Sequence, residues 1–462
     1  MKPEFYINGI NALTGDWLVA PMSVEDAARI ARGVKADRLA VSWLRGVWHR
    51  LIEPHLGLPL DIDPREVGKA GWGIVFHSDE APEVKEALIP LIEYRRSKAA
   101  DHSRVKVLDY RTGETRRAWL ARHGVAAGSV VPAKVPYYLL FVGSPEAIPF
   151  SFRHQIGVEY AVGSLHFDTA ADYGAYASRL LASEGQPHPS REALFFGVRH
   201  PFDTATQLSA DRLVRPLTEG LAERHGFRTR ALLAEQATKT ALLESLLSTG
   251  AAPPAFIFTA SHGVGFPAGH PRQRSTQGAL LCQEWPGFGI MSPRYYLAAA
   301  DILPGTELRG AITFHFACFS AGTPPHDRFL HESGSTPPAL AEKPFLAALP
   351  QRMLVAGALA CIGHVERAWG YSIALPDAGV QLLPFENAVG RILAGEPVGY
   401  ALKDFFERYA ALSVTLSSML EEISFGKRIP EHELAATWIS RNDAEGYLLL
   451  GDPACRLTVG SS

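Results

Sequence analysis

Residues 256–263 read Phe256-Ile257-Phe258-Thr259-Ala260-Ser261-His262-Gly263, an apolar run that ends at a histidine. A second run, Ala311-Ile312-Thr313-Phe314-His315-Phe316-Ala317-Cys318, ends at a cysteine. Short runs rich in β-branched and aromatic residues are typical of buried parallel strands. Ligands bind beyond the carboxyl ends of such strands. We therefore expect His262 and Cys318 to share one edge of a sheet.

A cysteine beside a histidine is the arrangement that nucleophilic thiol catalysis requires. The attacking species is the thiolate, and a neighbouring imidazole can take its proton and later protonate a leaving amine. The tetrahedral oxyanion needs backbone N–H donors. Because Gly263 has no side chain to block an approach, we predict that its N–H and that of Cys318 form the oxyanion hole.

Strands and helices alternate along most of the chain. The expected strands are 135–143, 193–198, 229–233, 255–260, 311–317, 352–363 and a closing strand at 447–459 that a Gly-Asp-Pro turn interrupts. The expected helices are 169–183 with Asp168 as its N-cap, 209–225 with Ser209 as its cap, 238–248, 385–393 and 399–416. This alternation predicts an α/β fold with a parallel or mostly parallel sheet flanked by helices.

Two motifs resemble those of the caspases. Ser261-His262-Gly263 is similar to the Ser-His-Gly of that family, and Phe316-Ala317-Cys318-Phe319-Ser320-Ala321-Gly322 resembles the neighbourhood of its nucleophile, with Ser320 where caspases have glycine. The histidine and the cysteine are 56 residues apart, and caspases place the histidine about 50 residues upstream. Leu140-Phe141-Val142-Gly143 and Gly451-Asp452-Pro453 are more similar to the gingipain-like branch of caspase-fold peptidases. The resemblance covers roughly residues 135–462.

The resemblance implies a cysteine endopeptidase of caspase-like fold that works through a Cys-His dyad and an acyl-enzyme, without a cofactor. Its partners would be a protein or peptide substrate and a regulatory protein, and analogy with relatives suggests a cell-death or defence pathway. A polar, proline-containing stretch at 185–190 is the best candidate for a boundary. We expect a caspase-like catalytic domain at 190–462, a gingipain-like accessory α/β segment at 131–189, and an N-terminal region, 1–130, whose fold the sequence leaves open.

The residue preference of the expected cleft is open to two interpretations. The loop after the first strand of the catalytic domain carries Arg199, and the following helix carries Asp211. Asp211 would attract a lysine or arginine side chain of a substrate, and Arg199 would attract an aspartate. We favour a basic residue, as in the gingipain-like relatives. Trp369 follows the strand 352–363 and is a candidate for the wall of the cleft.

Composition excludes several other classes of function. The net charge is −3, so no overall positive field is present to hold nucleic acid or an anionic membrane. No apolar run approaches the ~20 residues that a membrane span needs, and the polar start of the chain is unlike a secretion signal. The four cysteines form no Cys-x-x-Cys pair, and Cys361 with His364 supplies only two metal ligands. We expect a cytoplasmic protein without a metal.

A second class of function remains open from the sequence. The chain could be a catalytically silent caspase-fold scaffold or regulatory protein whose cleft binds a partner without cutting it. A third hypothesis is a protease that stays silent until a partner or ligand binds. The presence of both dyad residues favours an enzyme over the scaffold.

Overall fold

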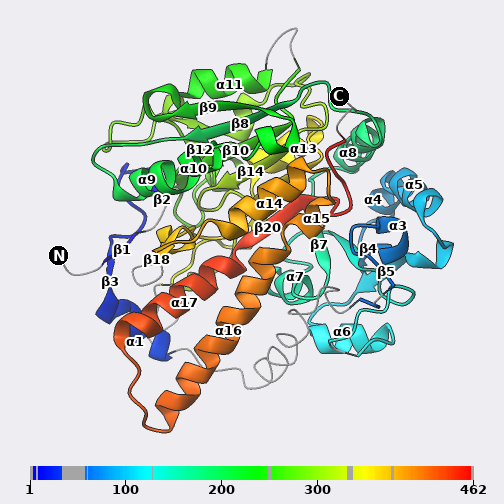
Figure 1. The fold of residues 1–462 in the computed structure, drawn as a ribbon, viewed down its shortest axis with the longest axis horizontal. Helices are drawn as coiled ribbons and strands as arrows, with labels where there is room; N and C mark the ends of the chain where they lie inside the picture. Colours follow the sequence, from blue (N-terminus) through cyan, green and yellow to red (C-terminus); the bar gives the residue numbers. More distant parts are fainter. Residues whose placement is uncertain are drawn as a thin grey trace.

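The computed structural model describes residues 4–6, 9–33, 58–59, 61–126, 128–247, 252–329, 337–375 and 379–458. A single sheet runs through the molecule in the order β5-β4-β6-β7-β20-β17-β14-β10-β8-β9 (Figure 1). In that order its strands are Val105–Tyr110, Trp72–His77, Tyr138–Val142, Ala161–Leu165, Tyr447–Gly451, Ala360–His364, Ile312–Phe316, Phe256–Ala260, Glu192–Gly197 and Arg228–Leu233. All neighbours are parallel except β17 and β20, which pair antiparallel. The expected mostly parallel sheet is therefore confirmed.

The sheet consists of two parallel halves that meet at the β17–β20 pair. One half contains β5, β4, β6, β7 and the C-terminal strand β20, and the other contains β17, β14, β10, β8 and β9. Interior strands such as β6, β10 and β14 are buried along their whole length. The two edge strands, β5 and β9, are only partly buried. This is the burial that a sheet covered on both faces produces.

Helices lie on the faces of both halves of the sheet (Figure 1). Those before residue 190 are α1 (Val24–Gly33), α3 (Val67–Ala70), α4 (Pro82–Ala87), α5 (Ile89–Lys98), α6 (Arg116–Arg122), α7 (Phe150–Gly157) and α8 (Ala170–Ser183). Those after it are α9 (Thr204–Ser209), α10 (Arg215–Leu217), α11 (Lys239–Leu247), α12 (Gln273–Thr276), α13 (Ala348–Val355), α14 (Leu383–Leu393), α15 (Val398–Ala401), α16 (Lys403–Ser424) and α17 (Glu431–Glu445). The long helices α16 and α17 pack side by side, and α1 packs against α17.

A smaller sheet stands next to the carboxyl ends of β10 and β14. Its order is β13-β12-β11-β2, with strands Tyr296–Leu297, Leu280–Leu281, Gly263–Gly265 and Gly9–Asn11. The strand β11 follows β10 after only two residues. The N-terminal β2 is the edge strand and pairs parallel with β11. Shorter pairs are β1 (Glu4–Phe5) with β3 (Met22–Ser23), β15 (Gly322–Thr323) with β16 (Phe345–Leu346), and β18 (Ala374–Leu375) with β19 (Gly379–Val380).

Several predicted elements begin elsewhere than the sequence suggested. The helix expected at 209–225 begins at Thr204, because Asp203 caps α9, and it is interrupted by the π turn Ala210–Val214 before α10. Residues 352–355, expected in a strand, belong to α13, and the strand starts only at Ala360. Thr169, one residue after the expected cap, accepts the capping bond of α8. The helix α17 was not expected at all.

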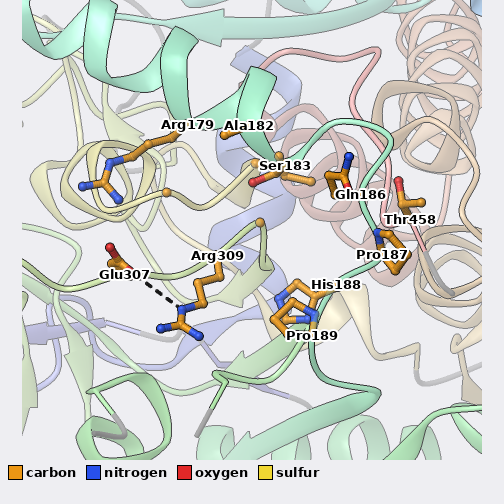
Figure 2. Close-up of a pocket in the computed structure, with 13 residues that line it drawn as sticks. Arg179, Ala182, Ser183, Gln186, Pro187, His188, Pro189, Glu307, Arg309 and Thr458 are labelled. Carbon is orange, nitrogen blue, oxygen red and sulfur yellow. Dashed lines mark ion pairs between the residues drawn. The ribbon is translucent and has the colours of Figure 1, made fainter. Parts of the chain in front are cut away.

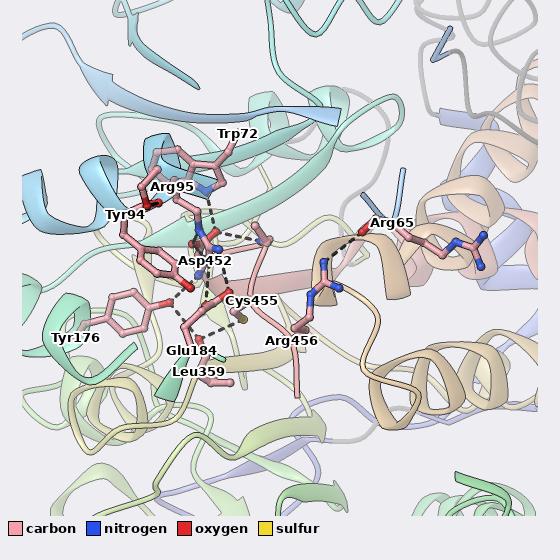
Figure 3. A network of polar contacts seen from close by, with 12 residues as sticks. Arg65, Trp72, Tyr94, Arg95, Tyr176, Glu184, Leu359, Asp452, Cys455 and Arg456 are labelled. Carbon is pink, nitrogen blue, oxygen red and sulfur yellow. Dashed lines mark hydrogen bonds and ion pairs between the residues drawn. The ribbon is translucent and has the colours of Figure 1, made fainter. Parts of the chain in front are cut away.

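A buried aspartate ties the C-terminal strand to the first half of the sheet (Figure 3). Asp452, in the turn after β20, accepts hydrogen bonds from Trp72 Nε1 at 2.9 Å and from Arg95 Nη2 at 2.7 Å. Its own backbone N–H donates to the hydroxyl of Tyr176 on α8, 2.7 Å away. Arg95 also pairs with Glu184, Nη1 to Oε1, at 2.9 Å. The Gly-Asp-Pro turn therefore joins β4, α5 and α8 to β20.

The sheet is continuous across the boundaries expected at residues 130 and 189. Strands from residues 72–110 and from residues 138–165 share one half with β20 from the end of the chain. The division into three segments stays a prediction. No helix among the described residues is both long and apolar enough to cross a membrane.

Candidate active site

Adjacent parallel strands deliver the candidate residues to one edge of the sheet. β10 and β14 pair in parallel, with Ala260 opposite Phe316. His262 and Cys318 each lie two residues beyond that pair, so the two predicted residues emerge side by side at the carboxyl ends of their strands. The loop after the next strand, β8, contributes Asp203.

Asp203 holds His262 in one orientation. The imidazole Nε2 lies 2.6 Å from Asp203 Oδ2, and both side chains are buried. Asp203 also caps α9, where its Oδ2 accepts the backbone N–H of Thr206 at 3.2 Å. Burial opposes ionisation of Asp203, but its contact with His262 and the hydrogen bonds from Thr206 outweigh it and keep the pKa of Asp203 below its usual range. The carboxylate is therefore ionised at neutral pH.

The ionised carboxylate also determines the tautomer of His262. A carboxylate can only accept hydrogen bonds, so the proton lies on Nε2 of a neutral His262. The other nitrogen, Nδ1, is buried and has no hydrogen-bond partner in the described part of the chain. The indole of Trp285 packs edge-on to the imidazole, with ring centres 5.9 Å apart. Nδ1 is consequently the atom that can accept a proton from a thiol.

Cys318 lies in a closed backbone environment. Its side chain is fully buried, and the backbone N–H of Ala368 donates to Sγ at 3.2 Å. Burial raises the pKa of the Cys318 thiol to about 12, although the Ala368 N–H and the nearby Arg367 favour the thiolate. The next residue, Phe319, has a positive φ of 59° and donates its N–H to the carbonyl of Glu366 at 2.6 Å. The turn after the cysteine is therefore fixed to the segment that follows β17.

Gly263 approaches Cys318 so closely that no other residue fits. A Cβ on Gly263 would lie 1.8 Å from the carbonyl oxygen of Cys318 and 2.9 Å from its nitrogen. Gly263 also faces Leu280 in β12 and Gly9 in β2. The two residues predicted to form the oxyanion hole are thus neighbours in space.

The residues predicted for the specificity pocket contact each other. Arg199 Nε lies 3.0 Å from Asp211 Oδ2, and Arg215 approaches the other oxygen of Asp211 at 3.6 Å. Each predicted charge is therefore already compensated by the other. Trp369 follows Ala368 and so lies near Sγ, but its indole is buried and packs on Phe329, with ring centres 4.7 Å apart.

Sequence reasoning assigned no role to Asp203. The signal was present, because Asp203-Thr204-Ala205-Thr206 has an N-cap residue at the start of a helix and lies in the loop after a strand of the same sheet. His315, in contrast, bonds to a side chain of the neighbouring strand β10. Its Nδ1 bonds to Thr259 Oγ1 at 2.9 Å, and burial lowers its pKa to about 3.

Two cavities lie away from the dyad. One, of about 360 Å³, is lined by Arg179, His188, Arg309, Gly310 and Gly357, and Arg309 pairs with Glu307 there (Figure 2). Because Gly310 and Gly357 precede β14 and β17, this cavity lies at the amino ends of the strands. The other, of about 400 Å³, adjoins Trp72 and Arg95. Among the described residues, no group of three His, Cys, Asp or Glu side chains is arranged to hold a metal ion.

No family model matches the chain, and no curated protein matches its sequence. Among solved structures it is similar to one described as a structure of a protease, with 13% identity over 86% of this chain and 79% of that chain, at a TM-score of 0.47. It is also similar to the Arg-specific cysteine proteinase gingipain R, with 11% identity over 86% and 80%, at a TM-score of 0.48. The complex of Porphyromonas gingivalis RgpB pro- and mature domains has 12% identity over 85% and 81%, at a TM-score of 0.48. Likeness of this degree assigns no activity to the chain.

Proposed function

We propose that the chain is a cysteine endopeptidase in which Cys318 is the nucleophile and His262 is the acid and base. The observation that supports this most strongly is the buried Asp203–His262 pair, which leaves Nδ1 of His262 without a partner beside the strand end that bears Cys318. A nucleophile, a base and a group that orients the base are the elements of this chemistry.

The proposed reaction uses only these side chains and two backbone donors. Nδ1 of His262 takes the proton of Cys318, and the thiolate sulfur attacks the carbonyl carbon of the scissile peptide. The carbonyl electrons move onto oxygen, where the N–H groups of Gly263 and Cys318 stabilise the charge. Nδ1 then gives its proton to the leaving amine as the C–N bond breaks, and water hydrolyses the resulting thioester.

We propose a basic residue on the acyl side of the scissile bond, as the resemblance to gingipain-like peptidases implies. In this proposal Asp211 exchanges its contact with Arg199 for the substrate side chain. Because the Arg199–Asp211 pair is about one-third exposed on each side, its exchange costs little. The proposed setting in a cell-death or defence pathway rests on the same resemblance alone.

The first experiment is cleavage of a fluorogenic peptide panel by the wild type and by Cys318→Ala. Cys361→Ala is the matched control, because Cys361 is equally buried on the neighbouring strand β17. We expect activity in the wild type and in the control and none in Cys318→Ala. Full activity in Cys318→Ala would refute the assignment, and cleavage only after aspartate would refute the basic preference.

A non-cutting scaffold is the second candidate, and the complete burial of Cys318 favours it. The two candidates differ in the reactivity of the thiol once the cleft is accessible. A peptidyl electrophile should label Cys318 of a protease far faster than it labels a free thiol, and His262→Ala should abolish that advantage. A scaffold would show neither effect.

A further inference from the structure

A small hairpin formed by residues 9–18, which we call the N-terminal hairpin, lies against Cys318 and Asp203. It comprises β2, a turn and the residues around Trp17, which returns to form a bridge with Ile10. Its two arms are joined by the bond from Leu18 N–H to the Gly9 carbonyl, at 2.8 Å. The turn is closed by Asn11 N–H, which donates to the Asp16 carbonyl at 2.8 Å. The hairpin is therefore a folded unit and not a loose end.

One arm of the N-terminal hairpin lies against the proposed nucleophile, and the other contacts the aspartate that orients His262. A Cβ on Gly9 would lie 3.3 Å from Cys318 Sγ. On the other arm, Trp17 Nε1 donates to Asp203 Oδ1 at 3.3 Å. Cys318 and His262 are both 0% exposed. In this form of the protein neither side chain can be reached by a peptide.

The N-terminal hairpin occupies a place shaped for an extended backbone. β2 adds a parallel strand to the edge of β11, the strand that starts with the predicted oxyanion donor Gly263. Ala12 continues this pairing by donating its N–H to the Gly265 carbonyl at 2.8 Å. Addition of a strand to a sheet edge is a common mode of peptide recognition, because its affinity comes from main-chain hydrogen bonds.

Side-chain packing holds the N-terminal hairpin in this place. Ile10 and Ala12 are buried in an apolar cluster with Val264, Trp285 and Met291. Leu18 lies across Gly9 and Gly265, where a Cβ on either glycine would be within 3 Å of its Cδ1. An occupant of this site needs an extended backbone with an apolar side chain at the position of Ile10.

We propose that the N-terminal hairpin is an internal competitor of the substrate: it fills the strand position beside β11 in which an extended peptide binds, and it must leave before Cys318 can react. This inference rests on the proposed peptidase function and adds its regulation. It also names the binding mode, in which the peptide backbone runs parallel to β11 and passes the thiol. Departure of the hairpin rehydrates Cys318 and removes the burial that disfavours its thiolate.

A cross-link tests whether the N-terminal hairpin covers the thiol in solution. A disulfide places the Cβ of one cysteine about 3 Å from the sulfur of the other, and position 9 meets this distance. We expect full-length Gly9→Cys to form a disulfide with Cys318 under mild oxidation. Thr14→Cys, at the exposed tip of the same hairpin, should form none. A folded Gly9→Cys protein that forms no such disulfide would overturn the proposal.

Alkylation of Cys318 tests whether the N-terminal hairpin is what excludes reagents. The rate of iodoacetamide labelling at Cys318 is followed by peptide mass spectrometry, so the readout does not depend on catalysis. We expect Leu18→Ala to raise this rate at least tenfold while the melting temperature shows an intact fold. Leu13→Ala, whose side chain is 41% exposed at the tip, should leave the rate unchanged. Equal rates in all three proteins would overturn the proposal.

The two proposals fail in distinguishable ways. Faster labelling of Leu18→Ala without cleavage of any peptide would support the covering role of the hairpin and contradict the peptidase. Cleavage by the wild type at a rate equal to that of Leu18→Ala would support the peptidase and contradict the competitor. Cleavage that is faster in Leu18→Ala than in the wild type, and unchanged in Leu13→Ala, would support both proposals.

Discussion

Asp203 determines which nitrogen of His262 is free to exchange a proton. Replacement of Asp203 by asparagine keeps the shape of the side chain but allows its amide group to donate to Nε2. The proton of His262 would then lie on Nδ1, which is the wrong tautomer for a base toward Cys318. The buried carboxylate thus acts on the thiol only through the imidazole.

We expect Asp203→Asn to lower kcat by roughly 10²–10⁴-fold, the usual contribution of a positioned acid or base. KM should change little, because Asp203 orients His262 and contacts no part of the proposed substrate. Steady-state kinetics on the best peptide of the panel measure both constants. Asp211→Asn is the matched control, because Asp211 follows the same strand but pairs with Arg199, and it should alter KM for basic substrates more than kcat. A kcat for Asp203→Asn within threefold of the wild-type value would contradict the role of Asp203 in orienting His262.

Position 263 requires glycine because of a close packing contact and not because of an unusual backbone conformation. The φ angle of Gly263 is not positive, so alanine could adopt it, but an added Cβ would lie 1.8 Å from the carbonyl oxygen of Cys318. We expect Gly263→Ala to lower the melting temperature clearly, because a backbone atom cannot move aside as a flexible side chain can. Gly174→Ala, in α8 with open space around it, should instead stabilise by about 0.5–1 kcal/mol. Calorimetry of the two variants compares them, and equal melting temperatures would contradict this packing.

At the level of elements, strands were easier to predict than helix starts. The strands β8, β10 and β14 match the expected ranges because each is a short apolar run whose neighbours are polar or small. The helix starts depend on single capping side chains, and Asp203 and Thr169 took this role in place of Ser209 and Asp168. Arg352–Val355 looked like part of a strand because an apolar run continues from α13 into β17. The spacing of apolar residues alone does not show where such a helix ends and the following strand begins.

The helix α17 places a buried acid beside the segment that contacts Cys318. Asp443 Oδ1 accepts the backbone N–H of Trp369 at 2.8 Å, and His364 Nε2 lies 3.5 Å from the same oxygen. Burial raises the pKa of Asp443 to about 7, although the Trp369 N–H and Arg408 oppose the shift. The pKa of Asp443 is thus higher in the folded protein than in the unfolded protein, where it is about 4. The contribution of Asp443 to stability is therefore complete below about pH 4 and is lost as the pH rises through about 7.

We therefore expect Asp443→Asn to gain stability relative to the wild type as the pH rises from 4 to 8. The gain should be on the order of 3–4 kcal/mol, because each unit of pKa shift corresponds to about 1.4 kcal/mol. Asparagine retains the acceptor for Trp369 and cannot ionise. Urea denaturation at several pH values measures the difference between the two proteins. A difference between Asp443→Asn and the wild type that does not change with pH would contradict the raised pKa.

At the level of the whole molecule, the sheet depends on contacts that are distant in the sequence. The sequence predicted the half of the sheet that holds His262 and Cys318, because those signals are local, and their role as a dyad stays a prediction. It did not predict that β20 joins strands from residues 72–165, or that β2 pairs with β11 and places Gly9 beside Cys318. Both arrangements depend on pairing partners more than 240 residues away, which the pattern of one segment does not specify. The N-terminal region was accordingly the least predictable part of the chain.

Asp452 links the C-terminal strand to the first half of the sheet through buried hydrogen bonds and an ion pair. Its replacement therefore tests how much these bonds contribute to the stability of that half. Asp452→Ala would leave the guanidinium of Arg95, which is 4% exposed, without one of its two carboxylates, and would leave the indole N–H of Trp72 without an acceptor. Loss of one partner from a buried ion pair costs about 3–5 kcal/mol, and we expect a loss of that size in the free energy of unfolding. Glu307→Ala breaks an ion pair with Arg309 that is more than half exposed on both sides, so it should cost at most about 1 kcal/mol. If urea denaturation gave similar losses for the two variants, Asp452 would not fasten the sheet, and the register of β20 beside β7 would have to rest on apolar packing alone.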